Sequence, residues 1–260
     1  TKRSSSDLGE IIAINEANEY PVLKSINADA GKGHIIFQTK GMEEIMHRKE
    51  NAMQTDTTMG YLKDECLPSV NLTFTSTYSS ILDCYVPILF GILFGMTADH
   101  YCEYFRTLLK LFKFENFEEF DTSWPGMVCD FSEAERAGFE SALRGHFNIE
   151  SSTKLDMARY YTCCEVHFIS SRARVARNHS VIPSQRKSEF DKLVTSLCQE
   201  GINLDSFNKQ VKALKKGFPR ATKWINWYSH EHRRHFIFPV FGKVAFTNDG
   251  NNTNGQESQN

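Results

Sequence analysis

Apolar and β-branched residues gather in three segments within the first hundred residues, and each segment predicts a strand. They run from 52 to 61, 70 to 76 and 86 to 95. A turn containing Pro68 and a short polar connector around 79–83 separate them. Connections this short favour antiparallel pairing of neighbouring strands. The pattern therefore predicts an antiparallel meander.

Helical periodicity follows, and after it comes a short strand that ends in an acid. Large apolar residues recur at i, i+3, i+4, i+7, i+8 and i+11 from Tyr101 to Phe112, which predicts an amphipathic helix starting near Thr97. The segment 126–130 is an apolar strand ending in Asp130. Ser132 is placed to cap a second helix with Glu133 and Glu135 in its first turn.

The rest of the chain shows weaker patterns. An apolar stretch at 160–169 is expected as a further strand, and helices are expected at 188–198, 204–214 and 221–235. The first fifty residues offer apolar segments at 11–14 and 34–38 and a helical pattern at 42–48. The tail from 247 is polar and typical of disorder. This order of elements predicts an α/β fold, with a mixed sheet flanked by helices.

Length and composition restrict the class of protein to which the chain can belong. A chain of 260 residues with 40% hydrophobic and 24% charged residues can bury one substantial core. The longest apolar run, Tyr85 to Met96, is shorter than the roughly 18 residues that a spanning helix needs, so no membrane association is expected. Seven scattered cysteines favour a reducing compartment. The start lacks a signal-peptide core and is not Met, so we expect an excerpt or a truncated copy.

Charge is uneven although the net charge is only -2. Basic residues gather between Ser170 and Arg234, whereas 115–121 is an acidic run. Solvated helix faces and a polyanion-binding surface both explain a local basic excess, and the sequence leaves the two open.

Three acids from distant segments could hold metal ions for phosphoryl transfer, because hard carboxylate oxygens bind the paired cations of such sites. Asp56 lies within an apolar strand, where an unpaired charge is costly, although a solvated strand face would also accommodate it. Asp130 ends a strand, and its alternative role is that of an ordinary acid at a helix N-terminus. Glu257 lies in the polar tail, and its composition alone indicates a flexible end.

Five landmarks that include these acids occur in a fixed order. They are the segments Asp56-Thr57-Thr58-Met59, Val86 to Leu93 with Thr97 and Tyr101, Cys129-Asp130-Phe131-Ser132-Glu133-Ala134, Cys164-Glu165-Val166-His167 and Asn252 to Ser258. Together they resemble the signature of the catalytic domain of Mutator-like element (MULE) transposases of the DDE type. Thr57, Met59 and Asn252 depart from the usual pattern, which leaves open whether this copy is active.

The resemblance implies an RNase H-like mixed sheet flanked by helices, with an α-helical insertion between the second and third acids. Residues 1–50 would be the lead-in of the core or the end of an upstream region. Residues 51–260 would be the catalytic domain, with the insertion at about 168–246. Asp56, Asp130 and Glu257 would form the catalytic triad and bind two Mg²⁺ or Mn²⁺ ions.

The implied activity is metal-dependent cleavage of DNA at transposon ends and strand transfer. The partners would be double-stranded DNA, as terminal repeats and target, and further copies of the chain on that DNA, in the nucleus. Four residues are expected near the site or facing DNA: Cys164, His167, Arg172 and Arg174. Cys163 or His179 could complete a zinc site with Cys164 and His167, but a Cys/His pair in an apolar strand more often packs in a core, and we assign no metal there.

Two other interpretations stay open. One is a domesticated, catalytically inactive DNA-binding or transcription-regulating protein derived from a transposase. The other is an unrelated RNase H-like nuclease that acts on RNA or hybrids. An aromatic cluster of Trp224, Trp227 and Tyr228 could stack on DNA, but its helical spacing is first of all that of a buried stripe.

Overall fold

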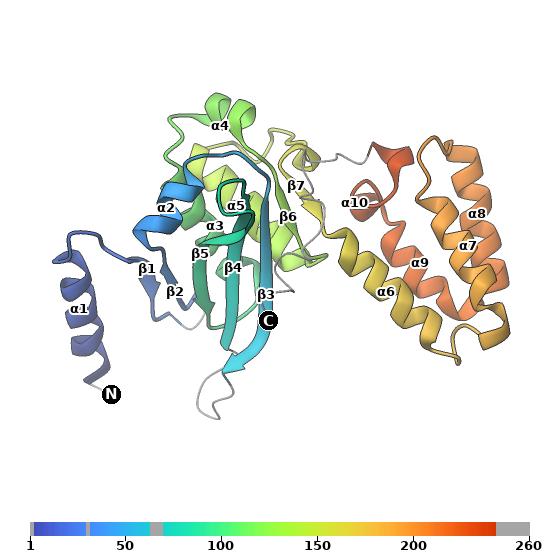
Figure 1. Cartoon of the computed structure of the whole chain (residues 1–260), viewed down its shortest axis with the longest axis horizontal. Helices are drawn as coiled ribbons and strands as arrows, with labels where there is room; N and C mark the ends of the chain where they lie inside the picture. Colours follow the sequence, from blue (N-terminus) through green and yellow to red (C-terminus); the bar gives the residue numbers. More distant parts are fainter. Residues whose placement is uncertain (1–2, 30–31, 63–69, 243–260) are drawn as a thin grey trace.

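The computed structural model describes residues 3–29, 32–62 and 70–242. The described strands form one mixed sheet in the order β1-β2-β5-β4-β3-β6-β7 (Figure 1). Their bounds are Leu23–Asn27 (β1), His34–Phe37 (β2), Met53–Leu62 (β3), Val70–Ser79 (β4), Cys84–Leu93 (β5), Met127–Cys129 (β6) and Tyr161–Cys163 (β7). Strands β3, β4 and β5 pair antiparallel, which confirms the predicted meander.

Strand pairing changes from antiparallel to parallel at β3. Strand β3 is antiparallel to β4 on one side but parallel to β6 on the other, and β7 continues the parallel half. Parallel neighbours need a crossover connection, and the segment between β5 and β6 supplies it with α3 (Ala98–Phe112) and α4 (Phe117–Ser123). The predicted α/β class, with a mixed sheet flanked by helices, is confirmed.

Helix α3 packs against α5 (Glu133–Phe147) beside the sheet. The predicted stripe is buried as expected, since Tyr104, Phe105 and Leu108 are all 0% exposed. The two helices approach closely at Gly138, where a Cβ atom would lie 2.5 Å from Cβ of Tyr101. Each fully buried side chain of this size stabilises the fold by about 1.5–3 kcal/mol.

The first fifty residues belong to the same sheet. They contribute β1, β2, α1 (Arg3–Glu16) and α2 (Lys40–Met46), and β2 pairs with β5. Thr39 caps the N-terminus of α2 with a capping box. Helix α1 stands beside the sheet edge at the end far from β7 (Figure 1).

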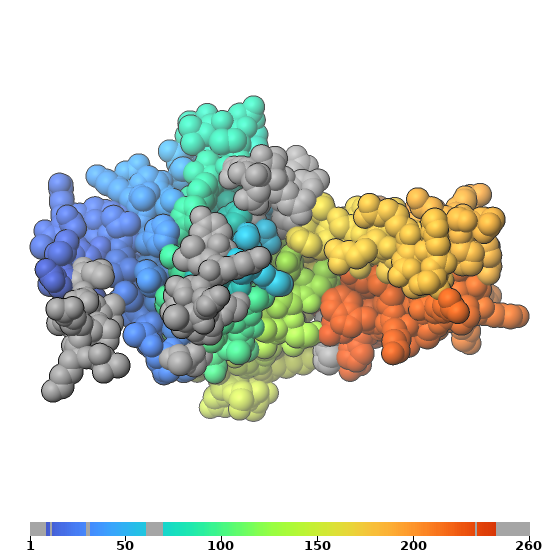
Figure 2. Space-filling view, turned by 90° about the horizontal axis from the view of Figure 1, so that it is seen from below, coloured from blue at the N-terminus to red at the C-terminus, as the bar shows by residue number. Residues whose placement is uncertain are grey.

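A block of helices follows β7 and extends away from the sheet (Figures 1 and 2). It comprises α6 (Glu165–Arg177), α7 (Lys187–Leu197), α8 (Leu204–Gly217), α9 (Thr222–Tyr228) and α10 (Glu231–Arg234). Four short 3₁₀ turns complete the described elements: Met157–Arg159, Ser184–Arg186, Pro219–Ala221 and Pro239–Phe241. Phe190, Leu214 and Phe218 are buried within the block and belong to the same apolar cluster as the core beside the sheet.

Two predictions about these elements were wrong. The strand expected over 160–169 ends at Cys163, and residues from Glu165 onward form α6, because Cys164 adopts an extended N-cap conformation and Glu165 suits a first helical turn. The helix expected over 221–235 breaks at Ser229 and His230 into α9 and α10. Among the described residues no helix is long and apolar enough to cross a bilayer.

Candidate metal centre

Strand register brings the first two predicted acids together. Strands β3 and β6 are parallel neighbours in which Met53 pairs with Met127 and Gln54 with Val128. Continuing that register places Asp130, just past the end of β6, beside Asp56 in the middle of β3. Two acids far apart in the sequence therefore meet at one edge of the parallel strands.

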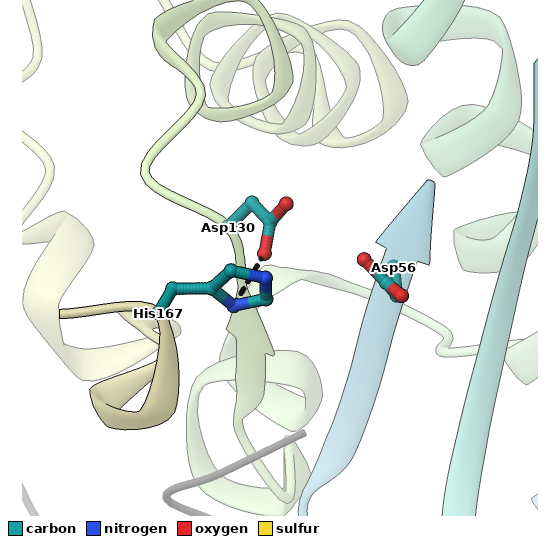
Figure 3. A group of neighbouring side chains, drawn as sticks. All are labelled: Asp56, Asp130 and His167. Atoms are coloured by element: carbon teal, nitrogen blue, oxygen red, sulfur yellow. Dashed lines mark ion pairs between the residues drawn. The ribbon is translucent and has the colours of Figure 1, made fainter. Parts of the chain in front are cut away.

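His167 completes the group from the first turns of α6. One ligand atom each from Asp56, Asp130 and His167 lies within 4.8 Å of the other two. Nδ1 of His167 approaches Oδ1 of Asp130 to 2.9 Å. Figure 3 shows this pair in contact, with Asp56 facing it from the neighbouring strand. All three residues are half-buried.

The contact between His167 and Asp130 is close but poorly aligned. The two atoms form an ion pair by distance, yet both are buried and neither completes a hydrogen bond of normal geometry. Polar atoms buried in this way are rare, and each calls for a partner such as an ion. A short distance without hydrogen-bond geometry is expected when two ligand atoms point to a common position and not at each other. A divalent cation at that position would fit the group.

Electrostatics also favour a cation here. The Asp130 carboxylate, and after it the Cys164 side chain, raise the pKa of His167 to about 11 against the opposing effect of burial. A proton on His167 therefore balances the carboxylate when no cation is bound. Carboxylate oxygens suit Mg²⁺ and Mn²⁺, whereas an imidazole nitrogen suits Zn²⁺, and His167 would have to lose its proton to bind a cation.

Hydrogen bonds from neighbouring residues reach both acids. Oδ1 of Asp56 accepts from the backbone N–H of Thr57 at 2.9 Å, and the Thr57 hydroxyl is bonded in turn by Tyr101 and Thr73. The Tyr161 hydroxyl donates to the backbone carbonyl of Asp130 at 3.1 Å. Residues next to metal ligands act in this way to fix ligand orientation.

Glu135, in the first turn of α5, is a buried acid close to this group that sequence reasoning missed as a site residue. Its side chain is 1% exposed. Burial, and next the negative charges of Asp130 and Asp56, raise the pKa of Glu135 well above its usual range. The Ser-x-x-Glu spacing after a strand acid was a visible signal, but it indicates an ordinary helix cap.

The other predicted site residues have different surroundings. Cys164 is fully buried at the N-cap of α6, next to His167. Arg172 lies between α6 and α7, where it donates to Thr195 and approaches Asp191 at 3.8 Å. Arg174 is exposed on α6. Glu257 lies outside the described residues, so its place in the triad stays a prediction.

The segment that follows Asp130 packs against the helical block. The Phe131 ring packs on those of Trp227 and Tyr228 of α9, at centroid distances of 5.8 and 5.3 Å. One turn further on, Glu133 pairs with Arg233 at 2.6 Å, and the Arg233 guanidinium lies 4.2 Å from the Trp227 ring centre. Tyr228 is buried, as the stripe interpretation expects, whereas Trp227 is 37% exposed.

Charge separates the two parts of the molecule. Residues 165–241 contain 14 Lys and Arg against 6 Asp and Glu, a net charge of +8, which leaves -10 on the rest of the chain. The candidate metal-binding group lies where these two parts meet, since Asp56 and Asp130 come from the sheet side and His167 from α6.

Comparison with models of protein families, with curated proteins and with solved structures finds no match for this chain.

Proposed function

We propose that the protein is a metal-dependent DNA-processing enzyme, the catalytic core of a cut-and-paste transposase of the MULE type with an RNase H-like fold. The observation that carries the proposal is the convergence of Asp56, Asp130 and His167 on a common point. The open mixed sheet, with its antiparallel and parallel halves meeting at β3, is compatible with that fold.

In this proposal Asp56, Asp130 and His167 hold a divalent cation, Mg²⁺ or Mn²⁺. When bound, such a cation supplies Lewis-acid stabilisation of charge on a phosphate during an in-line displacement. The two carboxylates would fix its position, and the cation would offset their repulsion of an approaching phosphate. Glu257 is the proposed third acid and would serve a second ion.

Double-stranded DNA is the proposed substrate because of the basic block beside the site. A surface of net charge +8 next to an acidic metal centre attracts a polyanion and directs it toward the centre. Exposed cations on α8 and after it, such as Lys212, Lys216 and Arg220, have no acidic neighbour within their own turn and would contact phosphates.

The test is cleavage of duplex DNA carrying terminal repeats, with Mg²⁺, Mn²⁺ or EDTA. We expect cleavage only with metal, and a loss of about 10²-fold or more in Asp56→Asn and Asp130→Asn because each removes a ligand charge. The matched control is Asp99→Asn, an exposed acid in the first turn of α3, which should cut at the parental rate. Parental rates in both site variants would refute the assignment.

The basic block also supports a second candidate, a DNA-binding or transcription-regulating protein without catalysis. It predicts salt-sensitive DNA binding with no cleavage and no metal requirement. The same experiment separates the candidates when binding is followed at several salt concentrations. Equal or better cleavage of an RNA–DNA hybrid would favour a nuclease of another class.

A further inference from the structure

The candidate metal centre combines two oxygen ligands with one nitrogen ligand. Asp56 and Asp130 offer carboxylate oxygens, whereas His167 offers an imidazole nitrogen (Figure 3). Mg²⁺ takes oxygen ligands, keeps several of its waters and is usually held by one or two carboxylates. The two acids alone would therefore make a site for Mg²⁺, and the imidazole is the ligand that such a site does not require.

The distance between two of the ligand atoms bears on the coordination geometry. Two ligands bound at about 2.1 Å and at a right angle, as in an octahedral site, lie about 3.0 Å apart. In a tetrahedral site with bonds of about the same length, they lie about 3.4 Å apart. Nδ1 of His167 and Oδ1 of Asp130 are 2.9 Å apart, and neither atom completes a hydrogen bond of normal geometry. Their spacing fits neighbouring ligands of an octahedral ion.

The ligand types and the spacing together favour one of the common divalent cations. Zn²⁺ accepts imidazole but prefers four ligands in a tetrahedral arrangement. Mg²⁺ is octahedral but prefers oxygen. Mn²⁺ takes octahedral, carboxylate-rich sites as Mg²⁺ does, and it belongs to the first-row series of metals that also bind nitrogen ligands. Mn²⁺ therefore suits both the mixed ligand set and the distance of 2.9 Å between Nδ1 of His167 and Oδ1 of Asp130.

We propose that His167 is the residue that makes this centre select Mn²⁺ over Mg²⁺. The inference rests on the proposed function, since it takes Asp56 and Asp130 to be ligands of the same cation. On binding, the cation replaces the proton in the ion pair between His167 and Asp130, and the neutral imidazole becomes a ligand. With an oxygen in place of that nitrogen, the centre would offer only the ligand type that Mg²⁺ prefers.

The first experiment compares the affinities of the whole chain for the two cations. Electron paramagnetic resonance of free Mn²⁺ gives the Mn²⁺ affinity, and competition by Mg²⁺ gives the ratio of the two affinities. The parent should bind Mn²⁺ at least about tenfold more tightly than Mg²⁺. His167→Asn puts an amide oxygen near the position of Nδ1, and it should lower the ratio of Mn²⁺ to Mg²⁺ affinity by about tenfold.

Two control variants separate selectivity from general weakening of the site. Asp130→Asn removes a carboxylate that both cations use, so both affinities should fall while their ratio stays near that of the parent. His179→Asn changes an exposed histidine beyond the end of α6 and should leave both affinities unchanged. A ratio that falls as far in Asp130→Asn as in His167→Asn would overturn the proposal, because selectivity would then not depend on the nitrogen.

A second experiment asks directly whether the nitrogen binds the cation. The electron spin echo of bound Mn²⁺ is modulated when an imidazole nitrogen is a ligand, so this modulation should be present in the parent and in His179→Asn but absent in His167→Asn. No modulation in the parent, or a parental affinity ratio in His167→Asn, would overturn the proposal while the metal centre itself stands. A parent that binds neither Mn²⁺ nor Mg²⁺ would overturn the metal centre and the proposed function with it.

Discussion

The sheet and the helical block differ in charge and in what each gives to the candidate site. The part of the chain outside 165–241 carries -10 and supplies two carboxylates through strand register, whereas the block carries +8 and supplies one imidazole. Neither part holds the ligand group alone. The difference teaches that the candidate site is a property of their junction, with two carboxylates on the negatively charged side and one imidazole on the positively charged side.

The largest expected effect concerns whether the sheet and the helical block unfold together. Phe139, between α3 and the sheet, and Phe190, within the block, are both 0% exposed. Truncating either to Ala should cost about 3–5 kcal/mol of unfolding free energy. Since one apolar cluster runs through both parts, we expect each variant to lower the midpoint of a single urea transition.

A split transition in Phe190→Ala, with circular dichroism and Trp fluorescence changing at different urea concentrations, would contradict that expectation. It would show the block to be a separate folding unit. Trp224 and Trp227 report on the block and Trp124 on the sheet side, so fluorescence of single-Trp variants distinguishes the two.

A smaller effect on the unfolding free energy is expected from the ion pair that joins the two parts. Arg233 is 16% exposed and pairs with Glu133, which is 46% exposed, at 2.6 Å. A double-mutant cycle with Arg233→Met and Glu133→Gln should give a coupling energy of about 1 kcal/mol in urea unfolding. Coupling indistinguishable from zero would mean that apolar contacts such as those of Phe131, and not this ion pair, hold the junction.

The smallest effect concerns acid sensitivity on the sheet side. Glu43 accepts a hydrogen bond from the Tyr20 hydroxyl at 2.6 Å, which lowers the pKa of Glu43 to about 2. The charged form is therefore favoured by folding, and its stabilisation is complete above the usual pKa of 4.5 and lost as the pH falls toward 2. The advantage of the parent over Glu43→Gln, under about 1 kcal/mol, should shrink within that window.

Glu189→Gln in the block is the comparison for this measurement. Glu189 pairs with Arg186 on a fully exposed surface, and the Arg186 guanidinium lowers its pKa. Solvent screens such a pair, so its removal should leave the pH dependence of unfolding unchanged. An equal effect at both positions would show that burial does not distinguish the two parts.

Sequence patterns predicted the elements that carry the carboxylates. The apolar and β-branched runs of β3, β4 and β5 and the stripe of α3 are strong local signals, and Ser132 caps α5 as expected. Strand β1 escaped prediction because its five residues are all half-buried at the sheet edge and show no alternation. Short edge strands take their structure from the neighbouring strand.

The site was harder to predict than the fold. Asp56 and Asp130 stood out as acids in apolar segments, and the register that joins them follows once β3 and β6 are parallel. His167 was misplaced on a strand because one apolar run covers both the end of β7 and the start of α6. Glu135 was unpredictable locally, since only tertiary packing decides whether such a carboxyl turns to its cap or to a neighbouring strand.

The parallel pairing of β3 with β6 has a consequence for synthesis of the chain. Asp56 leaves the ribosome first, and strands β3, β4 and β5 can pair before Asp130 exists. The three candidate ligands can meet only after the crossover helices, β6 and the start of α6 have all emerged. Assembly of the candidate site is thus one of the later steps in synthesis of the chain.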